Sequence, residues 1–172
     1  MKHVVTAAAT RNSVSRAQTF LDAVKAGPHA KAYGSYAQLV ADADVDIVYV
    51  GTPHSHHYQH ARLALEAGKN VLCEKAFTVN VEQARILVDI ARSKKLFLME
   101  AVWTRYFPLM QEISAIVTAG KLGKVHRVFA DLSFANEVET AFEDNNRMVN
   151  MDLAGGALLD CEICLITCQE WN

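Results

Sequence analysis

Two residues able to move a proton, Glu74 and Lys75, directly follow the apolar run Val71–Cys73. Such a run predicts a buried strand, and open α/β sheets bind ligands where their strands end. A lysine partly desolvated at that place can donate or accept a proton near neutral pH, and its charge can polarise a carbonyl or hydroxyl group. The position of Lys75 fits this role, and it also fits a solvated lysine at the end of a strand.

A second group of polar residues follows the β-branched run Val45–Val50, which predicts a parallel strand covered by helices on both faces. Gly51–Pro53 ends this strand, and the helical pattern of His54–Ala67 ends at the capping residue Gly68. Two strands joined by one helix form a right-handed βαβ unit. The residues that then converge on one crevice are Thr52, Pro53, His57, Glu74 and Lys75.

Arg11 follows another predicted strand, His3–Ala9, and precedes a helix that Asn12 or Ser13 can cap. In dinucleotide-binding folds the second strand ends at the adenosine ribose, where an acidic residue accepts the 2′-hydroxyl and an arginine accommodates a 2′-phosphate. Because no Asp or Glu occurs at this turn, NADP is favoured over NAD. The alternative is a surface arginine beside a helix cap.

Two clusters could bind zinc, which would make a hydrolase the third candidate function. His56 and His60 have the i, i+4 spacing that places two imidazoles on one helix face, but the intervening glutamate of zinc hydrolases is missing. The second cluster is Cys161, Cys164 and Cys168. Since neither cluster has a further ligand at a set spacing, we predict no metal site. We expect His57 in the pocket, the other histidines on the helix surface, and the cysteines in a helical core.

The alternation of strands and helices predicts an α/β fold with two domains. After a strand at Leu96–Glu100 and a helix that opens at Pro108, apolar and polar residues alternate along Val125–Phe134, which predicts an amphipathic strand of a different sheet. We therefore divide the chain into a dinucleotide-binding domain, residues 1–105, and the beginning of an α+β domain, residues 106–172. Trp103, at this boundary, is a core residue by default and could also wall a substrate pocket.

Composition excludes several classes of function. The 172 residues are 51% hydrophobic and 21% charged, with a formal net charge of −2, which predicts no nucleic-acid partner. No segment is long and apolar enough to predict a membrane span. Four cysteines, three of them near the C-terminal end, do not form the framework of a secreted disulfide protein. We expect a reducing, cytoplasmic location.

These motifs resemble the Gfo/Idh/MocA oxidoreductase family. The resemblance rests on Gly51-Thr52-Pro53 with His57, on Gly68-Lys69, and on Val71–Lys75, where Ala76 replaces the proline of the family's Glu-Lys-Pro hallmark. Phe97–Pro108 looks most like the dimeric dihydrodiol dehydrogenase branch, which includes NADP-dependent D-xylose dehydrogenases. Gly155–Asp160 is similar to the next family signature, whose aspartate faces the substrate.

The resemblance implies hydride transfer between NADP and a trans-dihydrodiol or aldose sugar, in a homodimer that pairs through the second domain's sheet. It makes Lys75 the proton relay and lets Asp160 orient the substrate. Thr52, Pro53 and His57 would border the nicotinamide ribose, Glu74 would contact the cofactor, Arg11 would hold the 2′-phosphate, and Trp103 and Arg105 would shape the substrate end.

The chain departs from the family pattern at two places. Cys164 stands where the family has a tyrosine or histidine, and no Gly-x-Gly turn, the family's pyrophosphate cradle, occurs in the sequence. We therefore expect an incomplete Rossmann-type sheet that lacks its first, central βα unit, with unpaired edges at His3–Ala9 and Val45–Val50. Either the two edges pair directly, or the chain is part of a longer reading frame truncated at both ends and inactive alone, which we favour. The alternative function is a non-catalytic Rossmann-like regulatory or interaction module.

Overall fold

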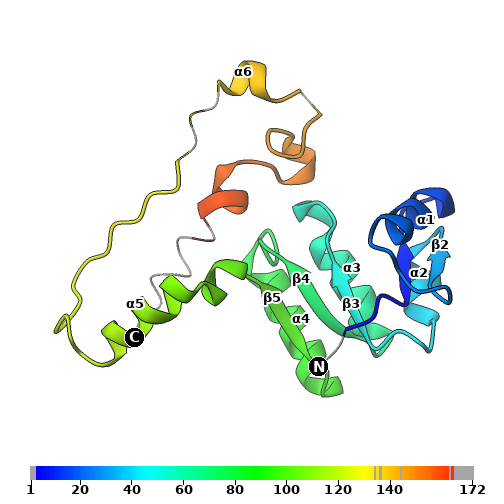
Figure 1. The fold of residues 1–172 in the computed structure, drawn as a ribbon, viewed down its shortest axis with the longest axis horizontal. Helices are drawn as coiled ribbons and strands as arrows, with labels where there is room; N and C mark the ends of the chain where they lie inside the picture. Colours follow the sequence, from blue (N-terminus) through cyan, green and yellow to red (C-terminus); the bar gives the residue numbers. More distant parts are fainter. Residues whose placement is uncertain (1–2, 134, 136, 144, 163, 165–172) are drawn as a thin grey trace.

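The computed structural model describes residues 3–133, 135, 137–143, 145–162 and 164 of the chain (Figure 1). Up to Ala101, short parallel strands alternate with helices, as the sequence predicts for an α/β fold. A long C-terminal arm then leaves the sheet through α5 and returns, so that Asp160 lies beside Lys75 at the end of β4. This return closes the candidate site.

The larger sheet holds the residues that form the site. It is parallel, in the order β3-β4-β5, with Val50 opposite Cys73 and Glu74 opposite Ala101. Its elements are β3 (Ile47–Val50), α3 (His54–Glu66), β4 (Asn70–Glu74), α4 (Val81–Lys94) and β5 (Leu98–Ala101). The helices α3 and α4 contact each other and cover one face of the sheet. The carboxyl ends of β3 and β4 are therefore neighbours, as a βαβ unit requires.

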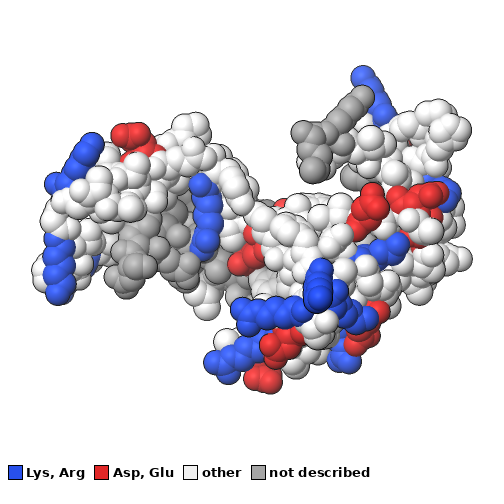
Figure 2. Space-filling model, turned by 90° about the horizontal axis from the view of Figure 1, so that it is seen from below, with Lys and Arg blue, Asp and Glu red and all other residues white. Residues whose placement is uncertain are grey.

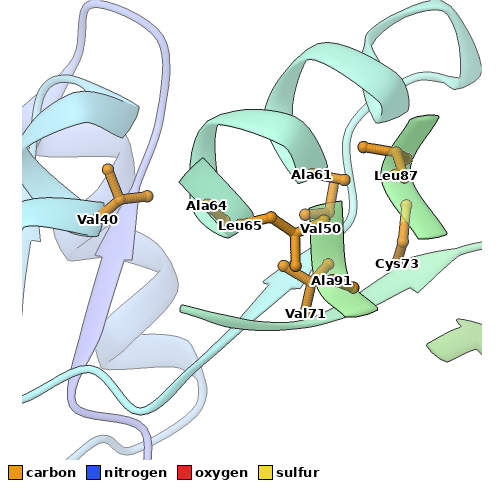
Figure 3. Packing of buried hydrophobic residues seen from close by; sticks show 9 residues of the cluster. All are labelled: Val40, Val50, Ala61, Ala64, Leu65, Val71, Cys73, Leu87 and Ala91. Atoms are coloured by element: carbon orange, nitrogen blue, oxygen red, sulfur yellow. The ribbon is translucent and has the colours of Figure 1, made fainter. Parts of the chain in front are cut away.

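The main core lies between this sheet and its two helices (Figure 3). Leu65, Leu87 and Val71 are fully buried there, with Val40 of α2 at one side. The opposite face is open in the described part of the chain, since Tyr49 is 59% and Ile47 46% exposed. The prediction that helices cover both faces of this strand is therefore wrong for the described residues.

A separate two-stranded parallel sheet forms at the N-terminal end. It comprises β1 (Ala7–Ala9), α1 (Val14–Ala23), β2 (Lys31–Tyr33) and α2 (Tyr36–Ala41). Here β1 is shorter than the predicted strand, and it pairs with β2 but not with β3. The helix α2 contacts β1 and β2 and also α3, so it bridges the two sheets. The edges of β1 and β3 thus do not pair directly, and the single predicted sheet is two sheets.

Helix ends follow the capping residues seen in the sequence. The side chains of Ser13, Ser35 and Asn80 each accept a hydrogen bond from the backbone N–H three residues later. Gly68 adopts a φ of 80° after α3, a left-handed conformation that glycine tolerates without steric cost. These local signals explain why the helix boundaries lie close to their predicted positions.

The C-terminal arm is mostly helical and irregular. It contains η1 (Trp103–Tyr106), α5 (Pro108–Thr118), α6 (Val138–Ala141), η2 (Met151–Leu153) and η3 (Leu158–Glu162). The predicted helix from Pro108 is confirmed, but the predicted strand at Val125–Phe134 is wrong: residues 125–133 form no strand, and Phe134 lies outside the described residues. A strand needs a neighbour to accept its backbone hydrogen bonds, and residues 125–133 have none in the described part. The second domain stays a prediction.

Charged side chains of both signs are interspersed over the face shown in Figure 2. Ion pairs among the described residues include Lys31 with Asp42 and Asp44, and Arg62 with Glu66. Among the helices of the described residues, none has the length and apolar character needed to cross a membrane.

Replacing Leu65 by Ala tests the main core. Leu65 is fully buried between α3 and the sheet, so Leu65→Ala is expected to lower the free energy of unfolding by about 2–5 kcal/mol, measured by urea denaturation. The matched control is Leu122→Ala, at a leucine that is 64% exposed, where a change within about 0.5 kcal/mol is expected. Equal losses in the two variants would contradict the described core.

Candidate active site

A cavity of about 280 Å³ opens at the carboxyl ends of β3 and β4. Its lining comes from the turn after β3, the start of α3, the end of β4 and the returning C-terminal arm. The lining residues are Gly51, Thr52, Pro53, His54, His57, Glu74, Lys75, Arg147, Leu153 and Asp160. The cavity therefore lies where a parallel sheet is expected to bind its ligand.

Lys75 and Asp160 form the ion pair at the centre of this cavity. The Lys75 Nζ donates to the backbone oxygen of Asp160 and lies 3.2 Å from its Oδ1. Both side chains are mostly buried, at 16% and 13% exposed. Burial by itself would raise the pKa of the Asp160 carboxyl, but hydrogen bonds from Arg147 and Lys75 outweigh it and hold this pKa below its ordinary value. Asp160 is thus an ionised acceptor for the Lys75 ammonium.

His57 joins the two strand ends that form the cavity floor. Its ring is fully buried, with Nδ1 2.7 Å from the Ala76 carbonyl oxygen and Nε2 2.7 Å from the Thr52 carbonyl oxygen. Burial lowers the pKa of His57 and outweighs the opposing effect of the two carbonyl groups. The neutral imidazole carries one N–H and donates to one of the two carbonyl oxygens at a time, while its ring fills the space between the turn after β3 and the turn after β4, which carries Lys75.

Glu74 is fixed at the side of the cavity by two hydrogen bonds. The Tyr49 hydroxyl donates to Glu74 Oε1 at 2.5 Å, and the Lys75 backbone N–H donates to Oε2 at 3.2 Å. Partial desolvation of the Tyr49 hydroxyl and its hydrogen bond to the Glu74 carboxylate raise the pKa of Tyr49 to about 12, so Tyr49 stays a donor across the physiological range. The Glu74 carboxylate consequently has one orientation relative to Lys75.

The structure brings six of the nine predicted site residues together. These are Thr52, Pro53, His57, Glu74, Lys75 and Asp160. Arg11 is exposed after β1, in the other sheet. Trp103 is 55% exposed and packs edge-to-face on Phe107 with ring centroids 4.9 Å apart, and Arg105 is exposed beside it. These last three do not line the cavity, and their roles stay predictions.

Two polar side chains that line the cavity, those of His54 and Arg147, were not predicted as site residues from the sequence. We predicted His54 on the helix surface, which is wrong: it is 7% exposed, and its Nδ1 lies 3.0 Å from the Ala154 carbonyl oxygen. Its position at the first turn of a helix that follows a buried strand was the available signal. Arg147 lies in the polar stretch Phe142–Asn150, and no spacing in the sequence connects it to the site.

The two candidate zinc clusters do not assemble in the described residues, where no group of three His, Cys, Asp or Glu side chains could hold a metal. His56 Nδ1 instead lies 2.8 Å from Ser55 Oγ, and His60 Nδ1 3.0 Å from Thr52 Oγ1. Burial raises the pKa of the Cys161 thiol, and Cys164 is buried, whereas Cys168 lies outside the described residues.

Comparison with known proteins identifies the family. The sequence profile of an oxidoreductase family with an NAD-binding Rossmann fold, GFO_IDH_MocA, matches residues 2–102. The chain belongs to this family. The GFO_IDH_MocA match covers both sheets and every strand of the structure, so the predicted family and fold class are confirmed.

Two curated relatives match nearly the whole chain. The D-xylose 1-dehydrogenase (NADP(+)) of Hypocrea jecorina is 56% identical over 171 residues, covering 97% of this chain and 44% of the relative. The trans-1,2-dihydrobenzene-1,2-diol dehydrogenase of Danio rerio is 41% identical over 167 residues, covering 96% of this chain and 46% of the relative. The chain thus spans less than half the length of these two curated relatives.

Solved structures share the fold of the family. An NAD binding oxidoreductase from Klebsiella pneumoniae matches 70% of this chain and 31% of its own, with a TM-score of 0.63 and 32% identity. KijD10, a 3-ketoreductase from Actinomadura kijaniata in complex with NADP, matches 70% of this chain and 37% of its own, with a TM-score of 0.62 and 32% identity.

The buried His57 makes stability depend on pH. Its pKa in the folded chain lies below the ordinary 6.5, so below pH 6.5 the unfolded chain binds the proton more readily. The free energy of unfolding is therefore expected to fall as the pH decreases through this window, by at most about 1.4 kcal/mol per pH unit from this group. Urea denaturation of the wild type and of His57→Gln from pH 8 to 5 measures it.

The substituted chain should show a smaller pH slope, whatever its stability at pH 8. The matched control is His126→Gln, because His126 is an exposed histidine of the C-terminal arm. An unchanged slope in His57→Gln would show that His57 does not carry the effect.

Proposed function

We propose that this chain carries the proton-transfer residues of an NADP-dependent oxidoreductase that moves a hydride between the cofactor and an aldose sugar or trans-dihydrodiol. The observation that supports this most is the Lys75 ammonium held on Asp160 in a cavity at the ends of β3 and β4. The printed activities of the two curated relatives supply the substrate classes. The whole protein's activity is part of the proposal.

The cavity residues fit the reactive end of NADP, which supplies the nicotinamide carbon that exchanges the hydride. Thr52 and Pro53 form the wall after β3, and the Glu74 carboxylate presents acceptor oxygens for a ribose hydroxyl. Arg11, exposed after β1, is our candidate for the 2′-phosphate. The sequence holds no Gly-x-Gly turn, so the described residues do not offer that cradle for the pyrophosphate.

Lys75 is the group placed to move the proton. Oxidation of a carbinol removes a hydride from carbon and a proton from oxygen, and Lys75, once its ammonium has released a proton to solvent, can take that proton as a neutral amine. In the reverse reaction its ammonium returns the proton to the carbonyl oxygen that receives the negative charge. Asp160 holds Nζ in place by its backbone and side-chain oxygens. Shared binding by these two oxygens limits the motion of the relay.

The predicted substrate contacts, the homodimer and the cytoplasmic location belong to the same proposal. Trp103 and Arg105 follow β5 on the arm and are our candidates for the substrate end. The homodimer and the cytoplasmic location remain predictions from the resemblance and from the cysteine content. A non-catalytic Rossmann-like module is the competing function, because the glycine-rich turn is missing from the sequence.

Replacing Lys75 by Met tests the proton relay. In the protein expressed from the reading frame that contains these residues, NADPH formation from D-xylose or a trans-dihydrodiol is followed at its absorbance. Lys75→Met is expected to lower kcat by about 10²- to 10⁴-fold, because the carbinol proton loses its acceptor. Binding of NADPH, measured by calorimetry, should change far less.

Lys121→Met, at an exposed lysine of the arm, is the control and should keep the wild-type kcat. Full activity in Lys75→Met would overturn the role of Lys75. A folded wild-type protein without affinity for NADPH would overturn the proposed function in favour of the non-catalytic module.

A further inference from the structure

We propose that Arg147 is a positioning residue of this site: it shares one oxygen of Asp160 with Lys75 and thereby keeps the Asp160 carboxylate ionised and directed at the lysine. This inference rests on the proposed function, since it explains how the proton relay is held. Neither the family profile, which ends at residue 102, nor any spacing in the sequence assigns a role to Arg147.

Three basic groups face the same carboxylate oxygen. Arg147 Nη1 lies 2.9 Å and Lys75 Nζ 3.2 Å from Asp160 Oδ1, and His54 Nε2 lies 3.8 Å from it. On the other oxygen, the Cys161 thiol is 3.8 Å from Oδ2. A mostly buried carboxylate is costly unless charged partners compensate for its lost water, and here Arg147 is the closest of them.

Arg147 reaches this oxygen because its own backbone folds onto the segment that leads to Asp160. The Gly156 N–H donates to the Met148 carbonyl at 2.8 Å, and the Gly155 N–H donates to the Asn150 carbonyl at 3.0 Å. A Cβ added at Gly155 would lie 2.5 Å from the Arg147 carbonyl oxygen, which is backbone and cannot swing away. Only glycine allows this approach, so Gly155 fixes the place from which the guanidinium extends.

The arrangement makes Arg147 matter for the state of Asp160 more than for the fold. Its side chain is 57% exposed, so it contributes little to a core. Without Arg147, the rise that burial causes in the pKa of the Asp160 carboxyl would be opposed by Lys75 and, when it is protonated, by His54. The Glu74 carboxylate on the cavity wall adds negative charge to the site. A protonated Asp160 has lost its negative charge, so its Oδ1 would be a weaker acceptor for the Lys75 ammonium, and the backbone oxygen of Asp160 would be the remaining strong acceptor.

Carbon-13 NMR of the Asp160 carboxyl group tests the proposal without requiring catalysis. The resonance is assigned by its loss in Asp160→Asn, and its titration is followed from pH 7 downward. Arg147→Gln is expected to move the titration midpoint upward, and Arg147→Lys, which keeps the charge, is expected to move it back toward the wild type. Gly155→Ala keeps the arginine but displaces it, and should also move the midpoint upward.

The matched control is Arg62→Gln, which removes an exposed arginine from its pair with Glu66 and should leave Asp160 unchanged. A midpoint in Arg147→Gln equal to that of the wild type would overturn the proposal, and so would a midpoint raised equally in Arg147→Lys and Arg147→Gln.

The activity assay separates this inference from the proposed function. In the active protein, Arg147→Gln is expected to lower kcat by about tenfold or more, with the KM for NADP little changed, since a misplaced relay slows the chemical step. If Lys75→Met abolishes turnover while Arg147→Gln leaves both the titration midpoint of Asp160 and kcat unchanged, Lys75 keeps its proposed role as the proton relay and the proposed role of Arg147 is wrong. If Arg147→Gln shifts the titration in a protein that does not turn over, the pairing stands and the proposed function fails.

Discussion

The carboxylate of Asp160 accepts hydrogen bonds from Lys75 at the end of β4 and from Arg147 on the returning arm. The bond from Lys75 joins residues that are 85 apart in the sequence, so it connects the sheet to the arm. A mostly buried carboxylate must be paired, and its partners here come from both the sheet and the arm. The position of the arm over the cavity therefore depends on this group, together with the contact between His54 and the Ala154 carbonyl oxygen.

The rest of the site is fixed by simpler constraints. Parallel strands joined by a helix place their carboxyl ends at the same edge, which brings Thr52 near Lys75. His57, buried between the carbonyl groups of Thr52 and Ala76, connects the two turns, and Tyr49 orients Glu74 from the neighbouring strand. His57, Tyr49 and Glu74 are held on α3, β3 and β4, and Thr52 and Lys75 lie in the turns directly after these strands, so the chemistry rests on the larger sheet.

Local sequence patterns predicted the features that depend on interactions between residues close together in the chain. The capping roles of Ser13 and Gly68, the helix from Pro108 and the convergence of His57 with Lys75 follow from spacing and from the geometry of a βαβ unit. The split into two sheets could not be predicted in this way, because it depends on which strand edges meet. The strand predicted over residues 125–134 does not form in residues 125–133. Alternation of apolar and polar residues predicts which face of a strand is buried, but a strand also needs a neighbouring strand to accept its backbone hydrogen bonds. The role of Arg147 could not be predicted from the sequence, because its hydrogen bond to Asp160 requires the close approach of the Arg147 backbone to Gly155.

The central claim is that Lys75 and Asp160 act as one unit in proton transfer. A double-mutant cycle on kcat in the active protein, with Lys75→Met, Asp160→Asn and the double variant, tests it most directly. If Asp160 acts through Lys75, the double variant should be no slower than Lys75→Met alone. If the two losses multiply, the residues act independently and the account of a shared relay is contradicted.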